Sequence, residues 1–143
     1  IPFRAFVIVG APFVPFEELV EWAVRSAEHA LLLGAESVSL IPLREGNGAV
    51  EALIARGQAR LPSLAELEEA LDRCSALGQG IVTADLWDLE RLAACAGCRQ
   101  QRIERLRRQN LSGVLEDHVR CGRCDKVLRA GHSSPALLRE EPP

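Results

Sequence analysis

The chain lacks the features that mark a start, a signal peptide or a membrane span. Its 143 residues include no methionine, and Ile1 already belongs to an apolar run, so we expect a fragment or a processed product. No apolar stretch approaches the roughly 20 residues that cross a bilayer, and no basic-then-apolar segment opens the chain. We therefore expect a soluble, cytoplasmic protein with no membrane partner.

Common catalytic motifs are absent as well. The sequence contains no Ser/His/Asp arrangement, no phosphate-binding glycine loop and no paired carboxylates, so we do not expect it to be a hydrolase alone. Its three histidines are poor candidates for metal ligands. His29 falls in an amphipathic helix, His132 in the tail, and His118 we expect at the surface or beside a metal site.

The composition is that of a folded domain, with 48% apolar and 26% charged residues. Charge is unevenly distributed: residues 1–90 carry 6 basic and 14 acidic side chains, whereas residues 91–143 carry 11 and 6. A basic C-terminal part suits an anionic partner, but it also suits a metal bound by thiolates, which attracts cations. Both interpretations stay open.

Strand and helix patterns alternate along residues 1–84. Residues 3–10 and 37–43 predict strands buried on both faces, and residues 81–84 predict a short third strand. Apolar periodicity predicts helices over 16–33 and 49–56, and Ser63 with Glu66 predicts a capping box that starts a helix over 63–77. This order is typical of parallel crossovers, whose ligands bind where the strands end.

Three strands are too few to close a barrel, which needs eight in its complete form. We therefore predict an α/β fold in which residues 1–90 are part of a half TIM-type parallel barrel, with partner strands encoded before Ile1. Residues 91–128 are predicted to form a small four-cysteine module, α-rich or ribbon-like, and residues 129–143 a disordered tail.

Four of the five cysteines form two C-x-x-C pairs, Cys95 with Cys98 and Cys121 with Cys124, with 22 residues between the pairs. This spacing predicts one metal bound by four thiolates. Glycine between each pair of sulfurs is expected to relieve the backbone there. Zinc is the first choice and an auxiliary iron–sulfur cluster the second, with unligated thiols as the alternative. Cys74 is expected to be a buried thiol without function.

Two further groups of residues are candidates for binding. Arg99, Arg102 and Arg105 lie three apart between the cysteine pairs, where one helix face could clamp the phosphates of RNA or simply be solvated. Asp85 and Asp88 follow the third strand, where a substrate would bind; the alternative role is helix capping, which Asp88 fits best.

Several motifs resemble one enzyme family. The run from Phe6 to Pro12, FVIVGAP, is followed by a long helix, a second strand at 37–42 and the Gly-Asn-Gly loop at 46–48, and this order resembles the later strands of radical S-adenosylmethionine (SAM) enzymes of the MiaB- and NifB-like group. The ADLWDLE stretch at 84–90, with the two C-x-x-C pairs, resembles the C-terminal extension of a bacterial subset. The resemblance covers residues 3–125.

The resemblance implies a parent enzyme that generates a 5′-deoxyadenosyl radical. It implies that Ile8 and Gly10 contact the adenine of SAM, with Phe6 and Phe13 in place of the glycine and glutamate of the family pattern, and that Leu40 and Ile41 add contacts. The motif C-x-x-x-C-x-x-C, which binds the 4Fe–4S cluster, is absent and would precede Ile1.

Without those ligands the chain alone is expected to be inactive. The competing hypotheses are a non-catalytic zinc-ribbon module that binds RNA or a protein partner, and a complete stand-alone zinc protein.

Overall fold

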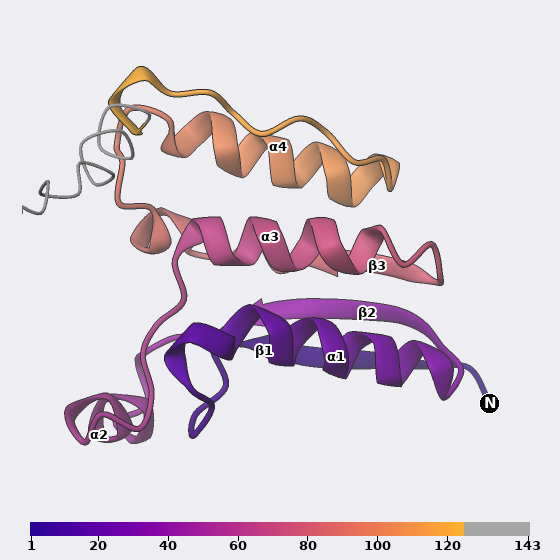
Figure 1. Ribbon diagram of the computed structural model, residues 1–143, viewed down its shortest axis with the longest axis horizontal. Coiled ribbons are helices and arrows are strands. Elements are labelled where there is room, and N and C mark those ends of the chain that lie inside the picture. Colours follow the sequence, from indigo (N-terminus) through magenta and orange to yellow (C-terminus); the bar gives the residue numbers. More distant parts are fainter. Residues whose placement is uncertain (125–143) are drawn as a thin grey trace, which may run out of the picture.

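A computed structural model describes residues 1–124, so the predicted tail at 129–143, His132 and the end of the predicted 91–128 module lie outside the described residues. In chain order the elements are β1 (Phe3–Val9), the 3₁₀ turn η1 (Phe16–Glu18), α1 (Leu19–Leu32), β2 (Ala35–Pro42), α2 (Ala49–Ala55), α3 (Leu64–Ser75), β3 (Ile81–Ala84), the 3₁₀ turn η2 (Leu89–Leu92) and α4 (Arg99–Ser112) (Figure 1). None of the helices described is long and apolar enough to span a membrane.

The three strands form a parallel sheet in the order β1-β2-β3. Val7 pairs with Leu40, and Leu40 pairs with Ala84, so the carboxyl ends of all three strands lie at one edge of the sheet. The predicted α/β class with a parallel sheet is confirmed, and within residues 1–124 the sheet does not close.

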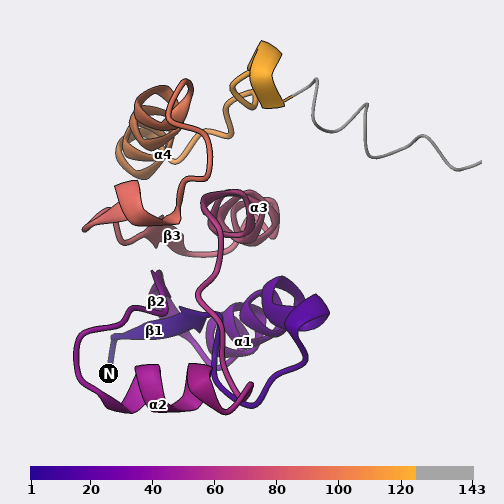
Figure 2. The same cartoon turned by 90° about the vertical axis from the view of Figure 1, so that its left-hand side faces the viewer.

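Helices α1 and α3 cover the same face of this sheet (Figure 2). Apolar residues of both helices recur at helical spacing, which places one stripe of each against the strands. The core between them is formed by residues that are almost fully buried, including Val9, Val38, Leu40, Leu67 and Leu71. The same apolar cluster continues into the cysteine-containing segment through Leu92, Ile103 and Leu106.

The opposite face of the sheet is bare over residues 1–124, so the prediction that the first strand is buried on both faces was wrong. Phe6 is 66% exposed and Ile8 is 46% exposed, although both lie within β1. Ser39 and Ile41 follow on the same face of β2, where they are partly buried. Parallel sheets are normally covered on both faces, so exposed apolar side chains on one face are unusual.

Helix α3 begins as the sequence predicts. The Ser63 hydroxyl accepts a hydrogen bond from the Glu66 N–H, and the Glu66 carboxylate accepts one from the Ser63 N–H, so the predicted capping box is confirmed. Contrary to the expectation from the sequence, Asp88 does not cap a helix with its side chain. It precedes η2 with a positive φ of 52° but makes no side-chain capping bond, and its carboxylate pairs with Arg91 at 3.1 Å.

The outer edge of β3 is occupied by a side chain of α4. The Asn110 side-chain amide donates to the Ala84 carbonyl at 2.8 Å and accepts from the Ala84 N–H at 2.9 Å. These two bonds take the place of a neighbouring strand at Ala84. Within the described part of the chain, the outer edge of β1 is paired with nothing.

Candidate metal centre

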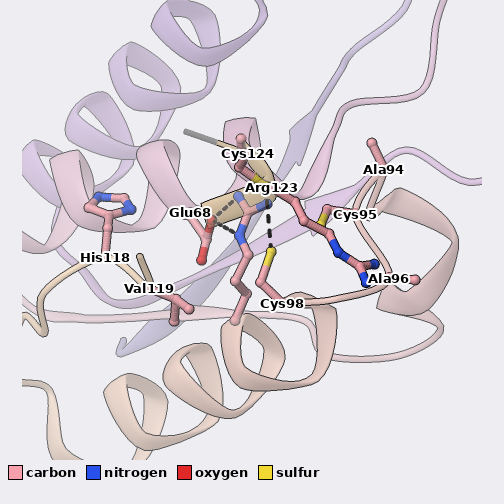
Figure 3. Close-up of a pocket in the computed structure, with 11 residues that line it drawn as sticks. Glu68, Ala94, Cys95, Ala96, Cys98, His118, Val119, Arg123 and Cys124 are labelled. Carbon is pink, nitrogen blue, oxygen red and sulfur yellow. Dashed lines mark hydrogen bonds and ion pairs between the residues drawn. The ribbon is translucent and has the colours of Figure 1, made fainter. Parts of the chain in front are cut away.

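The two C-x-x-C pairs meet, as the sequence predicts. The four sulfur atoms all lie within 4.8 Å of one another, with 3.8 Å between the Cys95 and Cys121 sulfurs and 3.8 Å between those of Cys98 and Cys124. Figure 3 shows three of these residues, Cys95, Cys98 and Cys124. Cys95 and Cys98 stand between η2 and α4, and Cys121 and Cys124 follow the segment that returns along α4 (Figure 1). The grouping forms a site that could hold a metal ion.

In each C-x-x-C pair, backbone N–H groups donate hydrogen bonds to the sulfur of the first cysteine. Hydrogen bonds from the N–H groups of Cys98 and then Gly97 lower the pKa of Cys95 to about 6. In the second pair, the N–H groups of Cys124 and Arg123 lower the pKa of Cys121 in the same way. The backbone therefore stabilises one thiolate in each pair.

The pKa of the second cysteine of each pair is raised instead. Neighbouring thiol groups, first that of Cys95, raise the pKa of Cys124 to about 12, while burial is the main cause that raises the pKa of Cys98. Four sulfurs at this spacing cannot all carry a negative charge unless a cation lies among them. A divalent metal ion supplies that charge, because thiolates rather than thiols are its ligands.

The glycines between the sulfurs do not have the conformation expected of them. Neither Gly97 nor Gly122 has a positive φ. A Cβ atom at Gly97 would lie 3.5 Å from the side chain of Arg123, an ordinary van der Waals contact, and a Cβ atom at Gly122 would meet nothing within 4 Å. Neither backbone conformation nor space therefore requires glycine at these two positions.

Two of the three arginines of the predicted row on α4, Arg102 and Arg105, face inward, while Arg99 is partly exposed. Arg102 Nε donates to Glu68 of α3 at 2.9 Å, and burial of the Glu68 side chain is nearly complete. Arg105 is only 1% exposed and donates to both oxygens of Asp72, at 2.9 and 2.8 Å. The open, solvated arginine face considered from the sequence is therefore not formed at these two residues.

Sequence reasoning missed the acidic partners of these arginines, although a signal was present. Glu68 and Asp72 lie four residues apart on α3 and so share one helix face. Arg102 also lies close to Cys98, and both Glu68 and the Cys98 sulfur raise its pKa against the effect of burial. The metal centre and the α3–α4 interface are thus joined through Arg102.

A cleft of about 650 Å³ is lined by three of the four cysteines, Cys95, Cys98 and Cys124 (Figure 3). Its walls are mostly apolar and include Ala65, Ala94 and Val119, and Glu68 and Arg102 also line it. His118 stands at its margin with its imidazole 2.9 Å from Asp72, not among the sulfurs, in agreement with the expectation that it is no ligand.

Comparison with known proteins adds no family to this geometry. The chain matches no protein-family model, no curated protein and no solved structure. The site must be interpreted from its own residues.

The residues assigned to SAM by resemblance are divided between two environments. Ile8 and Ile41 are neighbours on the bare face of the sheet, whereas Leu40 is fully buried beneath the helices. Gly10 has a φ of +89°, and a Cβ there would lie 3.0 Å from Pro62, so a larger residue would be strained and crowded. Asp85, at the end of β3, forms a 2.8 Å ion pair with Arg44.

Proposed function

We propose that this chain is the C-terminal portion of a radical SAM enzyme, in which it supplies SAM- and substrate-side loops and an accessory metal site. In this proposal the bare face of the sheet lines the inside of a larger partial barrel. Ile8 and Ile41, side by side on that face, contact SAM, which supplies the radical when its partner cluster is bound. The cluster ligands come from polypeptide that precedes Ile1.

The one-sided covering of the sheet is the observation that carries this proposal. Parallel sheets are normally covered on both faces, and in a barrel the helices cover the outside while side chains of all strands fill the inside. Phe6, Ile8 and Ile81 are large apolar residues left exposed on or beside the bare face. A barrel interior would bury them.

The edges of the sheet support the same arrangement. Asn110 occupies the outer edge of β3, while β1 presents an unpaired edge within residues 1–124. The edge of β1 therefore offers its backbone groups to additional strands. Strands encoded earlier in the gene would take that position in a barrel built in chain order.

The test begins with the nucleotide sequence upstream of the codon for Ile1. It should encode C-x-x-x-C-x-x-C within about 150 residues, the scale of half a barrel domain. The longer protein, purified without oxygen, should bind iron and SAM, and Ile8→Asp should weaken SAM binding more than the matched exposed change Leu32→Asp on α1. An upstream sequence without the motif would contradict the proposal.

For the four-cysteine site we propose zinc. Four ligands at about 2.3 Å from a single tetrahedral ion lie about 3.8 Å from one another, and two sulfur pairs have this separation. An iron–sulfur cluster distributes its cysteines over several iron atoms and so needs sulfurs farther apart. The spacing supports a single ion.

Metal analysis of anaerobically purified protein tests this assignment. We expect about one zinc per chain and little iron, and Cys98→Ser should lose the metal. Cys74→Ala is the matched control, because Cys74 is buried in the apolar core and belongs to neither pair. Stoichiometric iron with labile sulfide would contradict the zinc assignment and indicate an iron–sulfur cluster.

The competing hypothesis, a non-catalytic zinc-ribbon module that binds RNA, depends on the arginine row. Arg102 and Arg105 would have to leave Glu68 and Asp72 in order to contact phosphates. Breaking buried ion pairs is costly, so this hypothesis has weaker support than the enzyme.

A further inference from the structure

A second cleft, of about 460 Å³, opens where the strands end. Four of its lining residues are apolar, namely Leu43, Leu61, Leu92 and Trp87, and four are charged, namely Arg44, Glu45, Asp88 and Arg91. We propose that this cleft binds a planar heteroaromatic ring, a purine, which stacks on Trp87. Stacking on Trp87 needs only residues of this chain. The source of the purine, the cofactor or the substrate, rests on the proposed function.

Trp87 is fixed in place through its backbone. Its N–H donates to Asp85 Oδ1 at 3.0 Å, and its carbonyl accepts from Arg44 Nη2 at 2.6 Å. Arg44 in turn donates to Asp85 Oδ2 at 2.8 Å. The three residues form a closed set of hydrogen bonds that joins the loop after β2 to the loop after β3.

The ring of Trp87 is supported on one side and open elsewhere. The guanidinium carbon of Arg44 lies 5.2 Å from the ring centroid, within the range of a cation–π contact, yet the residue remains 68% exposed. The next residue, Asp88, has a φ of 52°, a conformation that non-glycine residues rarely adopt and that is concentrated at functional sites. Because the indole is largely exposed, the hydrogen bonds that hold this loop do not serve to bury the ring in the core.

Trp22 provides the contrast within the chain. It is also exposed and also lies near an arginine, with Arg25 at 5.7 Å, but its indole N–H is already bonded to Glu18 at 3.0 Å. Within residues 1–124 the indole N–H of Trp87 makes no such bond. Trp22 also stands on the regular surface of α1 rather than in a loop.

The chemistry of the cleft indicates the class of ligand. A volume of several hundred Å³ is typical of sites for small organic ligands, and this cleft combines an aromatic face with charged groups. Trp87 offers a π-face, and stacking on an aromatic side chain is the usual way to hold a base. Arg91 and Asp88 form an ion pair with each other at 3.1 Å, and their remaining donors and acceptors line the cleft, where they can meet the edge of a purine.

Fluorescence tests the proposal directly, because the chain has only two tryptophans. In Trp22→Phe, Trp87 is the only emitter, and we expect adenosine to quench it along a saturable curve. In Trp87→Phe, where only Trp22 emits, we expect weak quenching that rises linearly without saturation. Linear quenching in both variants would overturn the proposal.

Two further variants separate binding from folding. Arg44→Met in the Trp22→Phe background should weaken adenosine binding about tenfold, with an unchanged circular dichroism spectrum and metal content. By equilibrium dialysis, Trp87→Ala should bind adenosine at least tenfold more weakly than the unaltered chain, and Trp87→Phe should recover part of that loss. Equal binding by Trp87→Ala and the unaltered chain would also overturn the proposal.

Titration with SAM and with a short oligoadenylate RNA identifies the source of the purine. Saturation by SAM alone assigns the cleft to the adenine of the cofactor, and saturation by the RNA assigns it to a base of the substrate; either result supports the proposal. Failure of the enzyme proposal would appear as a missing upstream cluster motif and leave the adenosine result unaffected. Failure of the purine site would appear as linear quenching while that motif is present.

Discussion

Arg105 of α4 and Asp72 of α3 form a two-pronged ion pair in which the arginine is 1% exposed. Arg105 Nη2 reaches both carboxylate oxygens, at 2.9 and 2.8 Å, and also donates to the Glu116 carbonyl at 2.6 Å. One side chain thus connects α3, α4 and the segment that leads to the second cysteine pair. Its removal would leave buried acidic groups uncompensated.

Replacement of Arg105 by alanine is therefore expected to destabilise the protein strongly. We expect a loss of about 3–5 kcal/mol in the free energy of unfolding, measured by urea denaturation, because Asp72 loses its arginine and the buried Glu68 loses one of its two. Arg107→Ala is the matched control, since Arg107 forms an exposed pair with Glu104 that contributes less than about 1 kcal/mol. Equal losses in the two variants would contradict the role given to Arg105.

Removal of the metal is expected to lower stability in a way that zinc reverses. Bound metal stabilises only the folded chain, and at 100 times the dissociation constant this amounts to about 2.7 kcal/mol. A chelator should lower the melting temperature of the unaltered chain and of Cys74→Ala but not that of Cys98→Ser. A chelator-insensitive melting temperature in the zinc-loaded protein would argue against a structural metal.

The pairing of Glu66 with Arg60 predicts a loss of stability in acid. Hydrogen bonds from Arg60 are the largest cause that lowers the pKa of Glu66 from 4.5 to about 2. Because the pKa is lower in the folded chain, the stabilisation is present above pH 4.5 and is lost as the pH falls toward 2.

The pair is partly exposed, which reduces its contribution. We expect the free energy of unfolding of the unaltered protein to exceed that of Glu66→Gln by about 1–2 kcal/mol at pH 6 and by almost nothing at pH 2. Urea denaturation across this pH range measures the difference. Glu69→Gln, an exposed change on the same helix, should show no such convergence. A constant gap between the unaltered protein and Glu66→Gln would show that the carboxylate charge contributes nothing.

Asn110→Ala should expose the edge of β3. The buried N–H and C=O of Ala84 would lose their partners, at a cost of about 1–3 kcal/mol. Hydrogen exchange at the Ala84 amide should accelerate accordingly, while Ser112→Ala, an exposed change at the end of α4, should leave it unaltered. An unchanged exchange rate in Asn110→Ala would mean that the amide is protected by other contacts.

Much of this arrangement was predictable because its signals are local. The capping box of Ser63 and Glu66 is contained in four residues, and the C-x-x-C spacing restricts each cysteine pair to one tight turn. The bare face of β1 was not predictable, because Phe6 and Ile8 look like core residues whatever covers them. The inward arginines were missed because their partners lie more than 30 residues earlier in the chain.

The occupied edge of β3 also limits how copies of this chain can associate through their strands. A sheet with two open edges can add copies without end, as in a fibre, whereas a sheet with one open edge can join one other copy and is then complete. Within residues 1–124, Asn110 blocks the addition of a strand at Ala84, so a second copy of this sheet would pair through β1 wherever that edge is not already taken by strands of a longer protein.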